Sequence, residues 1–186
     1  PRMPLRDPMR DPMRDPLRES GPAAGPVRVT AESGPWPLHG SAAAKALEAQ
    51  ALAGRAAGEL MEHAGLAVAR LARALAPSAG LVEIWCGPGN NGGAGYVAAR
   101  RLHQSGTPVR VRECGVPERL PTDAAQARQR ALEAGVAPWS PTQAAGNATA
   151  RPDLVIDALL WLGTSRAPEG MLADAIGRIQ ASGALV

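Results

Sequence analysis

The chain has 186 residues, a formal net charge of +3 and 45% hydrophobic residues, which suits one domain of ordinary size and argues against a two-domain enzyme. Its four tryptophans and one tyrosine are too few for the platforms that stack single-stranded nucleic acid, and its arginines are scattered, which gives little support for a polyanionic partner. Two cysteines cannot build a disulfide framework or a zinc site, and no apolar run reaches the about 18 residues that span a bilayer, so we expect a cytoplasmic protein.

The first 37 residues differ in composition from the rest of the chain. An Arg-Asp-Pro unit recurs three times between residues 6 and 16, and a Pro/Gly-rich stretch follows. A proline at every fourth position removes backbone donors and clashes with the preceding helical turn. We therefore expect a disordered tail and linker over residues 1–37 and a folded domain over residues 38–186.

From residue 42 onward, helical and strand patterns alternate. In chain order, the pattern predicts helices over 42–53 and 56–76, a strand over 81–86, a helix over 94–104, a strand over 108–113, a helix over 122–134, a strand over 154–158, a helix over 168–181 and the opening of a fourth strand at 184–186. Such alternation predicts a parallel sheet covered by helices on both faces, a three-layer α/β/α, Rossmann-like fold. Because the chain stops where a strand begins, we expect the sheet to be incomplete at the C-terminus.

A glycine-rich segment, Cys-Gly-Pro-Gly-Asn-Asn-Gly-Gly-Ala-Gly over residues 86–95, follows the first predicted strand. In an open parallel sheet, ligands bind at the carboxyl ends of the strands, and a following helix start offers N–H groups to phosphate. One alternative is a tight turn that needs positive φ angles. Another is an NAD-dependent oxidoreductase, because Gly87, Gly89 and Gly92 have the spacing of a dinucleotide fingerprint and Glu113 follows 21 positions later, where an acid would meet a ribose hydroxyl.

Asp157 lies at the carboxyl end of the otherwise apolar strand over residues 154–158, and we expect it at the same edge as the glycine-rich segment. A carboxylate in that place would be partly desolvated, which favours a cation partner or a shifted pKa. The alternative is a cap for the following turn. Arg166, in the next loop, has the chemistry to pair with a diphosphate, although an exposed arginine without a ligand fits equally well.

At residues 86–95 and the Tyr-Val-Ala-Ala-Arg that follows them, the sequence resembles the NAD(P)H-hydrate epimerase domain. The resemblance covers residues 38–186 and includes Leu-Met-Glu-His-Ala-Gly at 60–65, Val-Ile-Asp-Ala-Leu-Leu at 155–160 and the loop at 163–170. It implies interconversion of the R and S forms of NADH and NADPH that are hydrated at C6 of the nicotinamide ring. It also implies a homodimer and a C-terminal ADP-dependent dehydratase domain, or a separate dehydratase chain, as partner.

Carried over by motif position, the resemblance also implies the site residues. Asp157 would be catalytic, and Asn91 and Asp157 would bind a potassium ion. The residues that would contact the hydrated nucleotide are Asn90, Asn91, Gly92, Gly93, Ala94, Trp161, Leu162, Gly163, Thr164, Ser165, Arg166 and Ala167.

Three departures from the family pattern make a non-catalytic nucleotide-binding module, or a degenerate fragment of a bifunctional enzyme, the main alternative. Ala94 stands where the family has Asp, so the glycine-rich segment lacks a carboxylate. Trp161 stands where the family has Gly, and its indole is expected to fill ligand space or distort a turn more than to stack on a base. The chain also ends before the family's next strand and the Asp-x-Pro-Ser-Gly segment that supplies further ligands.

Overall fold

The computed structural model describes residues 40–139, 150–161, 164 and 166–186. The tail predicted over residues 1–37 lies outside this part of the chain. The described residues form, in order, α1 (Ser41–Leu52), α2 (Glu59–Leu75), β1 (Val82–Cys86), α3 (Asn90–Gln104), β2 (Val109–Glu113), the 3-10 turn η3 (Pro117–Arg119), α4 (Thr122–Glu133), β3 (Leu154–Ala158) and α5 (Met171–Ala181). None of the helices in these ranges is long and apolar enough to cross a membrane.

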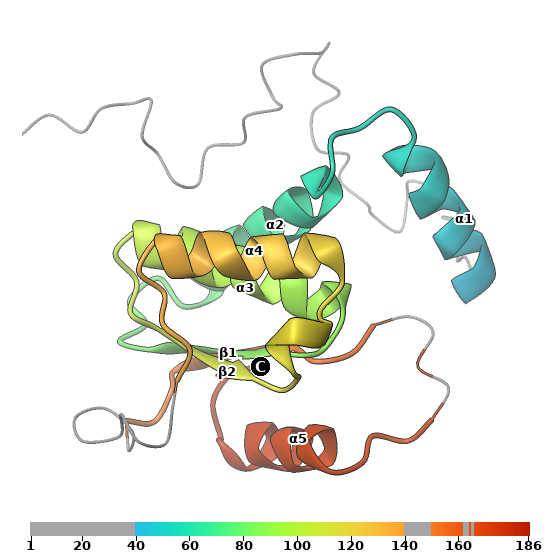
Figure 1. Ribbon diagram of the computed structural model, residues 1–186. Helices are drawn as coiled ribbons and strands as arrows, with labels where there is room; N and C mark the ends of the chain where they lie inside the picture. The colour runs from blue at the N-terminus through green and yellow to red at the C-terminus, as the bar shows by residue number, and fades with distance from the viewer. Residues whose placement is uncertain (1–39, 140–149, 162–163, 165) are drawn as a thin grey trace, which may run out of the picture.

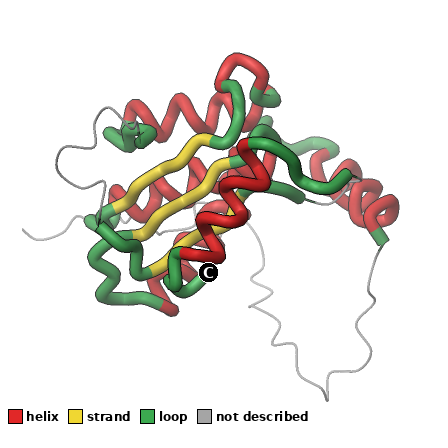
Figure 2. Tube along the Cα trace, turned by 90° about the horizontal axis from the view of Figure 1, so that it is seen from below, coloured by secondary structure: helices red, strands yellow, loops and turns green. Residues whose placement is uncertain are grey.

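The three strands form one parallel sheet in the order β2–β1–β3. β1 is buried along its whole length because it pairs on both sides and is covered on both faces. Helices α2, α3 and α4 lie on one face and α5 lies on the other, so the predicted three-layer α/β/α architecture is confirmed (Figure 1). α1 stands away from the sheet in both views and is mostly exposed (Figures 1 and 2).

Two apolar clusters hold the layers together, one on each face of the sheet. On the side of α2, α3 and α4, the alternate β1 residues Val82, Ile84 and Cys86 pack against the helices. On the side of α5, Trp85 packs with Val155 and with residues of that helix. The period-two alternation of the pleated strand thus divides β1 between two cores.

The fourth predicted strand begins to pair with β3. Leu185 forms an isolated parallel bridge with Leu154, and the N–H of Val155 donates to the carbonyl of Leu185 at 2.7 Å. The chain therefore returns from α5 to lie parallel to β3, as the crossover connection of a parallel sheet requires.

Candidate functional site

The carboxyl ends of the three strands meet at one edge of the sheet. The register pairs Cys86 of β1 with Glu113 of β2 and with Ala158 of β3. Just beyond the strands, the N–H of Gly87 donates to Ala158 at 3.0 Å, and the N–H of Cys114 donates to Cys86 at 2.8 Å. The glycine-rich segment and the end of β3 are thus joined directly, at the edge where open α/β proteins bind ligands.

The glycine-rich segment forms the first turn of a helix. The sequence pattern predicted a helix from residue 94, but α3 begins at Asn90, with Gly89 as its N-cap. The interpretation as a turn that needs positive φ is wrong, because the glycines with positive φ in the described chain all lie elsewhere. These glycines are required by close packing instead: a Cβ on Gly92 would lie 2.0 Å from the carbonyl oxygen of Gly87, and one on Gly95 would lie 2.8 Å from the Cβ of Ala158.

Asn91 connects the start of α3 to the segment after β3. Its side-chain Nδ2 donates a hydrogen bond to the backbone carbonyl of Leu160 at 2.8 Å, in a partly buried position. Its neighbour Asn90 is exposed at the first position of the helix. The amide orientation leaves the Asn91 Oδ1 on the other side of the group, where an oxygen ligand is available to a cation or a hydroxyl.

Asp157 lies at the same edge, but its side chain is exposed. The expectation of a partly desolvated carboxylate is therefore wrong, because Asp157 lies near the end of a strand and no element of the described chain covers it. Its Oδ1 accepts a hydrogen bond from the N–H of Leu159 at 2.9 Å, which is the capping contact of the alternative interpretation. Burial raises the pKa of the Cys114 thiol on the neighbouring strand end; the positive charge of Arg112 opposes this shift, and the negative charge of Asp157 adds to it.

A pocket of about 480 Å³ lies in the segment that follows Leu160. Three of the predicted substrate-contacting residues, Thr164, Arg166 and Ala167, line this pocket together with Leu160, Pro168, Glu169 and Leu172. The predicted contacts at Leu162, Gly163 and Ser165 lie outside the described residues. The role of Leu160 is not predictable from its side chain, because it accepts through a backbone carbonyl that any residue would supply.

Trp161 does not obstruct this pocket. Its indole is 61% exposed and is not among the residues that line the cavity, so the expectation that it fills ligand space is wrong for this structure. Its carbonyl accepts a hydrogen bond from Thr164 Oγ1 at 3.0 Å, and no described non-glycine residue adopts a positive φ.

Glu113, the acid of the oxidoreductase alternative, is already bonded to protein groups. It accepts a hydrogen bond from the Tyr96 hydroxyl at 2.7 Å and an ion pair from the Arg128 guanidinium. Burial raises the pKa of Tyr96, and the nearby Cys86 and Glu113 raise it further, so the phenol stays protonated and donates. A ribose hydroxyl would have to displace these partners, which disfavours this alternative.

The polar groups at this edge of the sheet are mainly oxygen atoms that could bind a cation. In the described chain no three His, Cys, Asp or Glu residues group as a metal site. What the edge offers is the amide oxygen of Asn91, the carboxylate of Asp157 and backbone carbonyls. This donor set suits a hard cation that binds oxygen and does not suit a transition metal.

These features define an α/β protein of Rossmann-like architecture with a candidate ligand site at the carboxyl edge of its sheet, between the start of α3 and the loop after β3. Residues 57–186 match the family described as YjeF-related protein N-terminus. The chain belongs to this family. The match begins just before α2, so α1 precedes it.

Similar proteins bear out the family and the fold. The chain is 43% identical over 131 residues to an NAD(P)H-hydrate epimerase of Rhodobacter capsulatus, covering 66% of this chain and 60% of that protein. It is 37% identical over 131 residues to the bifunctional NAD(P)H-hydrate repair enzyme Nnr of Thermofilum pendens, covering 68% of this chain and 25% of that protein. The crystal structure of yeast ynu0, YNL200c, superimposes with a TM-score of 0.62 at 22% identity, covering 76% of this chain and 63% of the yeast chain. The chain thus spans between a quarter and about three fifths of these relatives.

Proposed function

We propose that this chain is an NAD(P)H-hydrate epimerase that interconverts the R and S forms of hydrated NADH and NADPH. Family membership and the names of the relatives support this activity. The observation that carries the proposal is the hydrogen bond from Asn91 to the carbonyl of Leu160, because it joins the glycine-rich helix start to the pocket beyond Asp157.

In the proposed complex, the nucleotide lies across this edge. Residues 90–94 contact it through the first turn of α3, whose backbone N–H groups and positive dipole end favour phosphate. The loop over residues 161–167 forms the second contact surface, and Arg166 pairs with the diphosphate through its planar guanidinium. Asn91 and Asp157 hold a potassium ion, which supplies positive charge beside the nucleotide when it is bound.

The proposed chemistry needs one group that passes protons. The C6–O bond breaks as Asp157 gives a proton to the departing hydroxyl, which leaves as water and makes the ring cationic. A water molecule then adds to the opposite face of C6 and returns a proton to the carboxylate. The sequence of steps restores the acid and inverts the configuration at C6 without an oxidant or a reductant.

The direct test adds the chain to one purified epimer of NADH hydrate and resolves R from S by chromatography, with potassium or sodium as the cation. We expect approach to the mixed equilibrium with potassium, and loss of at least a hundredfold in rate in Asp157→Asn. Asp174→Asn, an exposed aspartate on α5, is the matched control and should retain the wild-type rate. Equal rates in Asp157→Asn and wild type would remove Asp157 from the proposed chemistry.

A homodimer, a dehydratase domain or chain as partner, and a cytoplasmic location belong to the same proposal. One relative is named a bifunctional repair enzyme, which supports the pairing of the epimerase with a second activity. Gel filtration with light scattering tests the dimer: a monomeric mass at micromolar concentration would contradict it.

The second candidate is a nucleotide-binding module without catalysis, and the first turn of α3 favours it because that turn contains no acidic residue. This candidate predicts binding of the hydrate without turnover, and turnover restored in Ala94→Asp. If the unmodified chain equilibrates the epimers, the first proposal stands and this candidate is excluded.

A further inference from the structure

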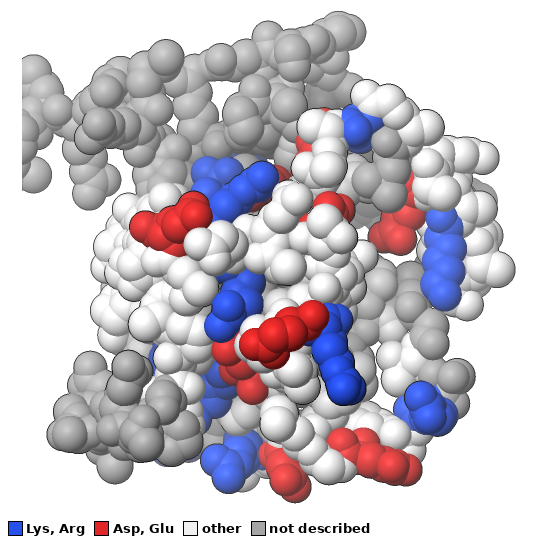
Figure 3. Space-filling view, in the orientation of Figure 1, with Lys and Arg blue, Asp and Glu red and all other residues white. Residues whose placement is uncertain are grey.

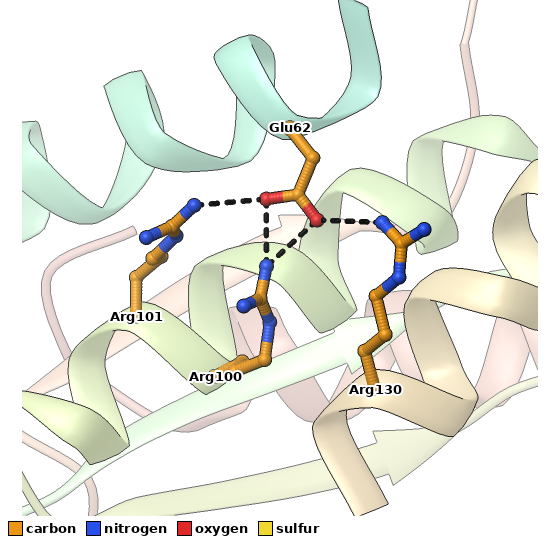
Figure 4. Close-up of polar contacts among 4 residues, drawn as sticks. All are labelled: Glu62, Arg100, Arg101 and Arg130. Carbon is orange, nitrogen blue, oxygen red and sulfur yellow. Dashed lines mark hydrogen bonds and ion pairs between the residues drawn. The ribbon is translucent and has the colours of Figure 1, made fainter. Parts of the chain in front are cut away.

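A second cluster of charged side chains lies in the helical layer, outside the site described above. Glu62 of α2 accepts hydrogen bonds from three arginines, two of α3 and one of α4 (Figure 4). Arg100 Nη2 reaches both carboxylate oxygens at 2.7 and 2.6 Å, and Arg101 and Arg130 reach one oxygen each at 3.1 and 3.3 Å. A single carboxylate is therefore shared by three guanidinium groups.

This cluster holds more positive than negative charge. The only other acid that lines its pocket in the described chain is Glu59, which is paired with Arg55. Among the described residues alone, Arg55 balances Glu59, and Arg100, Arg101 and Arg130 against Glu62 give a net charge of +2. The pKa of Arg100 is lowered, first by burial and further by the neighbouring Arg101 and Arg130, although Glu62 opposes the shift. The Nε of Arg100 is also buried with no hydrogen-bond partner among the described residues.

The cluster borders a pocket of about 490 Å³ between α2, α3 and α4. Its polar wall is formed by the guanidinium groups, and its apolar wall by Ala56, Ala57 and Leu66. Gly58, the N-cap of α2, lies at its rim, so the positive end of that helix dipole faces the pocket as well. This combination offers a place for an anion and for an apolar body attached to it.

The pocket is separate from the strand-end site. Asn91 and Arg100 both belong to α3 and are nine residues apart, which corresponds to about 14 Å along a helix that rises about 1.5 Å per residue. Basic and acidic side chains are interspersed on the described part of the face in Figure 3.

We propose that this pocket binds a small organic phosphate in its dianionic form. The charge of a dianion matches the surplus of two, and the planar guanidinium forks suit phosphate oxygens. A bare phosphate leaves most of the volume empty, whereas a phosphate ester with a small apolar group fills the space against Ala56 and Leu66. The ligand shares the arginines with Glu62 and does not displace it.

Titration calorimetry in a low-salt buffer at pH 7.5 tests the proposal, with phenyl phosphate and inorganic phosphate as probes. We expect phenyl phosphate to bind with a Kd below about 1 mM, and at least tenfold more tightly than inorganic phosphate. Arg130→Gln should weaken phenyl phosphate at least tenfold, and it should still fold because the Arg130 side chain is 47% exposed. Arg130→Lys, which keeps the charge and loses the fork, should bind with an intermediate Kd.

Arg119→Gln is the matched control, since it removes the same charge from an exposed position of η3 outside the pocket. Equal weakening in Arg119→Gln and Arg130→Gln would show general attraction to a basic protein and overturn the proposal. No binding of phenyl phosphate at 10 mM would overturn it as well. Circular dichroism checks that each variant is folded. Because Arg130 lies outside the strand-end site, the epimerase assay reports on the proposed function independently.

Discussion

Replacing Gly92 with alanine tests whether close packing, and not backbone flexibility, requires glycine at the start of α3. The added Cβ would lie 2.0 Å from the carbonyl oxygen of Gly87 and 2.9 Å from its N and C atoms, and these backbone atoms cannot rotate away. Overpacking typically costs about 1–3 kcal/mol, and a backbone contact this short belongs at the upper end. Alanine recovers about 1 kcal/mol of helix propensity, so the net loss of unfolding free energy is about 2 kcal/mol.

Urea denaturation followed by circular dichroism measures this loss. With a slope of about 1–3 kcal/mol per molar urea, the midpoint should fall by about 1 M. Gly177→Ala is the matched control, because Gly177 is also helical, in α5, and a Cβ there would meet nothing within 4 Å. It should stabilise the protein by about 0.5–1 kcal/mol. If the two variants have equal midpoints, the short approach between Gly92 and Gly87 does not explain the glycine.

Three further predictions follow from buried and paired groups. Glu83→Gln should cost about 3–5 kcal/mol of unfolding free energy by denaturation, because it removes a buried negative charge that pairs with both Arg110 and Arg112; a loss below 1 kcal/mol would contradict this. The Arg100 and Arg101 guanidiniums hold the pKa of Glu62 below its usual value, against the opposing effect of burial. The ionised Glu62 therefore stabilises the fold above its unfolded pKa of about 4.3, and this stabilisation is lost as the pH falls through the lower pKa of the folded state. The stability difference between wild type and Glu62→Gln should therefore shrink in acid, and a pH-independent difference would refute the linkage. Burial raises the pKa of the Cys86 and Cys114 thiols, so Ellman's reagent should label the native protein slowly at pH 8 and label both thiols in urea; fast native labelling would be inconsistent with this.

Much of the fold follows from the sequence because parallel strands are short apolar runs that differ from their surroundings. The strand over residues 154–158 has the predicted bounds, and the other two differ by a single residue at their start. The start of α3 was missed because two glycines and two asparagines have poor helix propensity. Packing reverses that preference: the absence of a Cβ at Gly92 and Gly95 lets the helix lie directly against Gly87 and Ala158.

The candidate site is likewise only partly predictable from the sequence. Chain order alone predicts that Asn91 and Asp157 meet at one edge, because the ends of parallel strands coincide. The exposure of Asp157 was not predictable, since it depends on which elements cover the sheet near β3. The grouping of the arginines around Glu62 was not predictable either, because Arg100 and Arg130 lie 30 positions apart on two helices and meet only after α3 and α4 pack.

Asp157 is proposed both to bind the potassium ion and to carry the proton, and substitutions at this residue can separate the two roles. Oδ1 accepts the Leu159 N–H, and an oxygen that accepts one hydrogen bond still has a lone pair for a cation. Asparagine at this position keeps an oxygen that can bind a cation but cannot pass a proton. Asp157→Asn should therefore retain a higher melting temperature in KCl than in NaCl while losing epimerisation, and Asp157→Ala should lose both. If Asp157→Asn loses the potassium effect and Asp157→Ala does not, the ion does not bind through this side chain. If both variants keep turnover, a group other than Asp157 carries the proton.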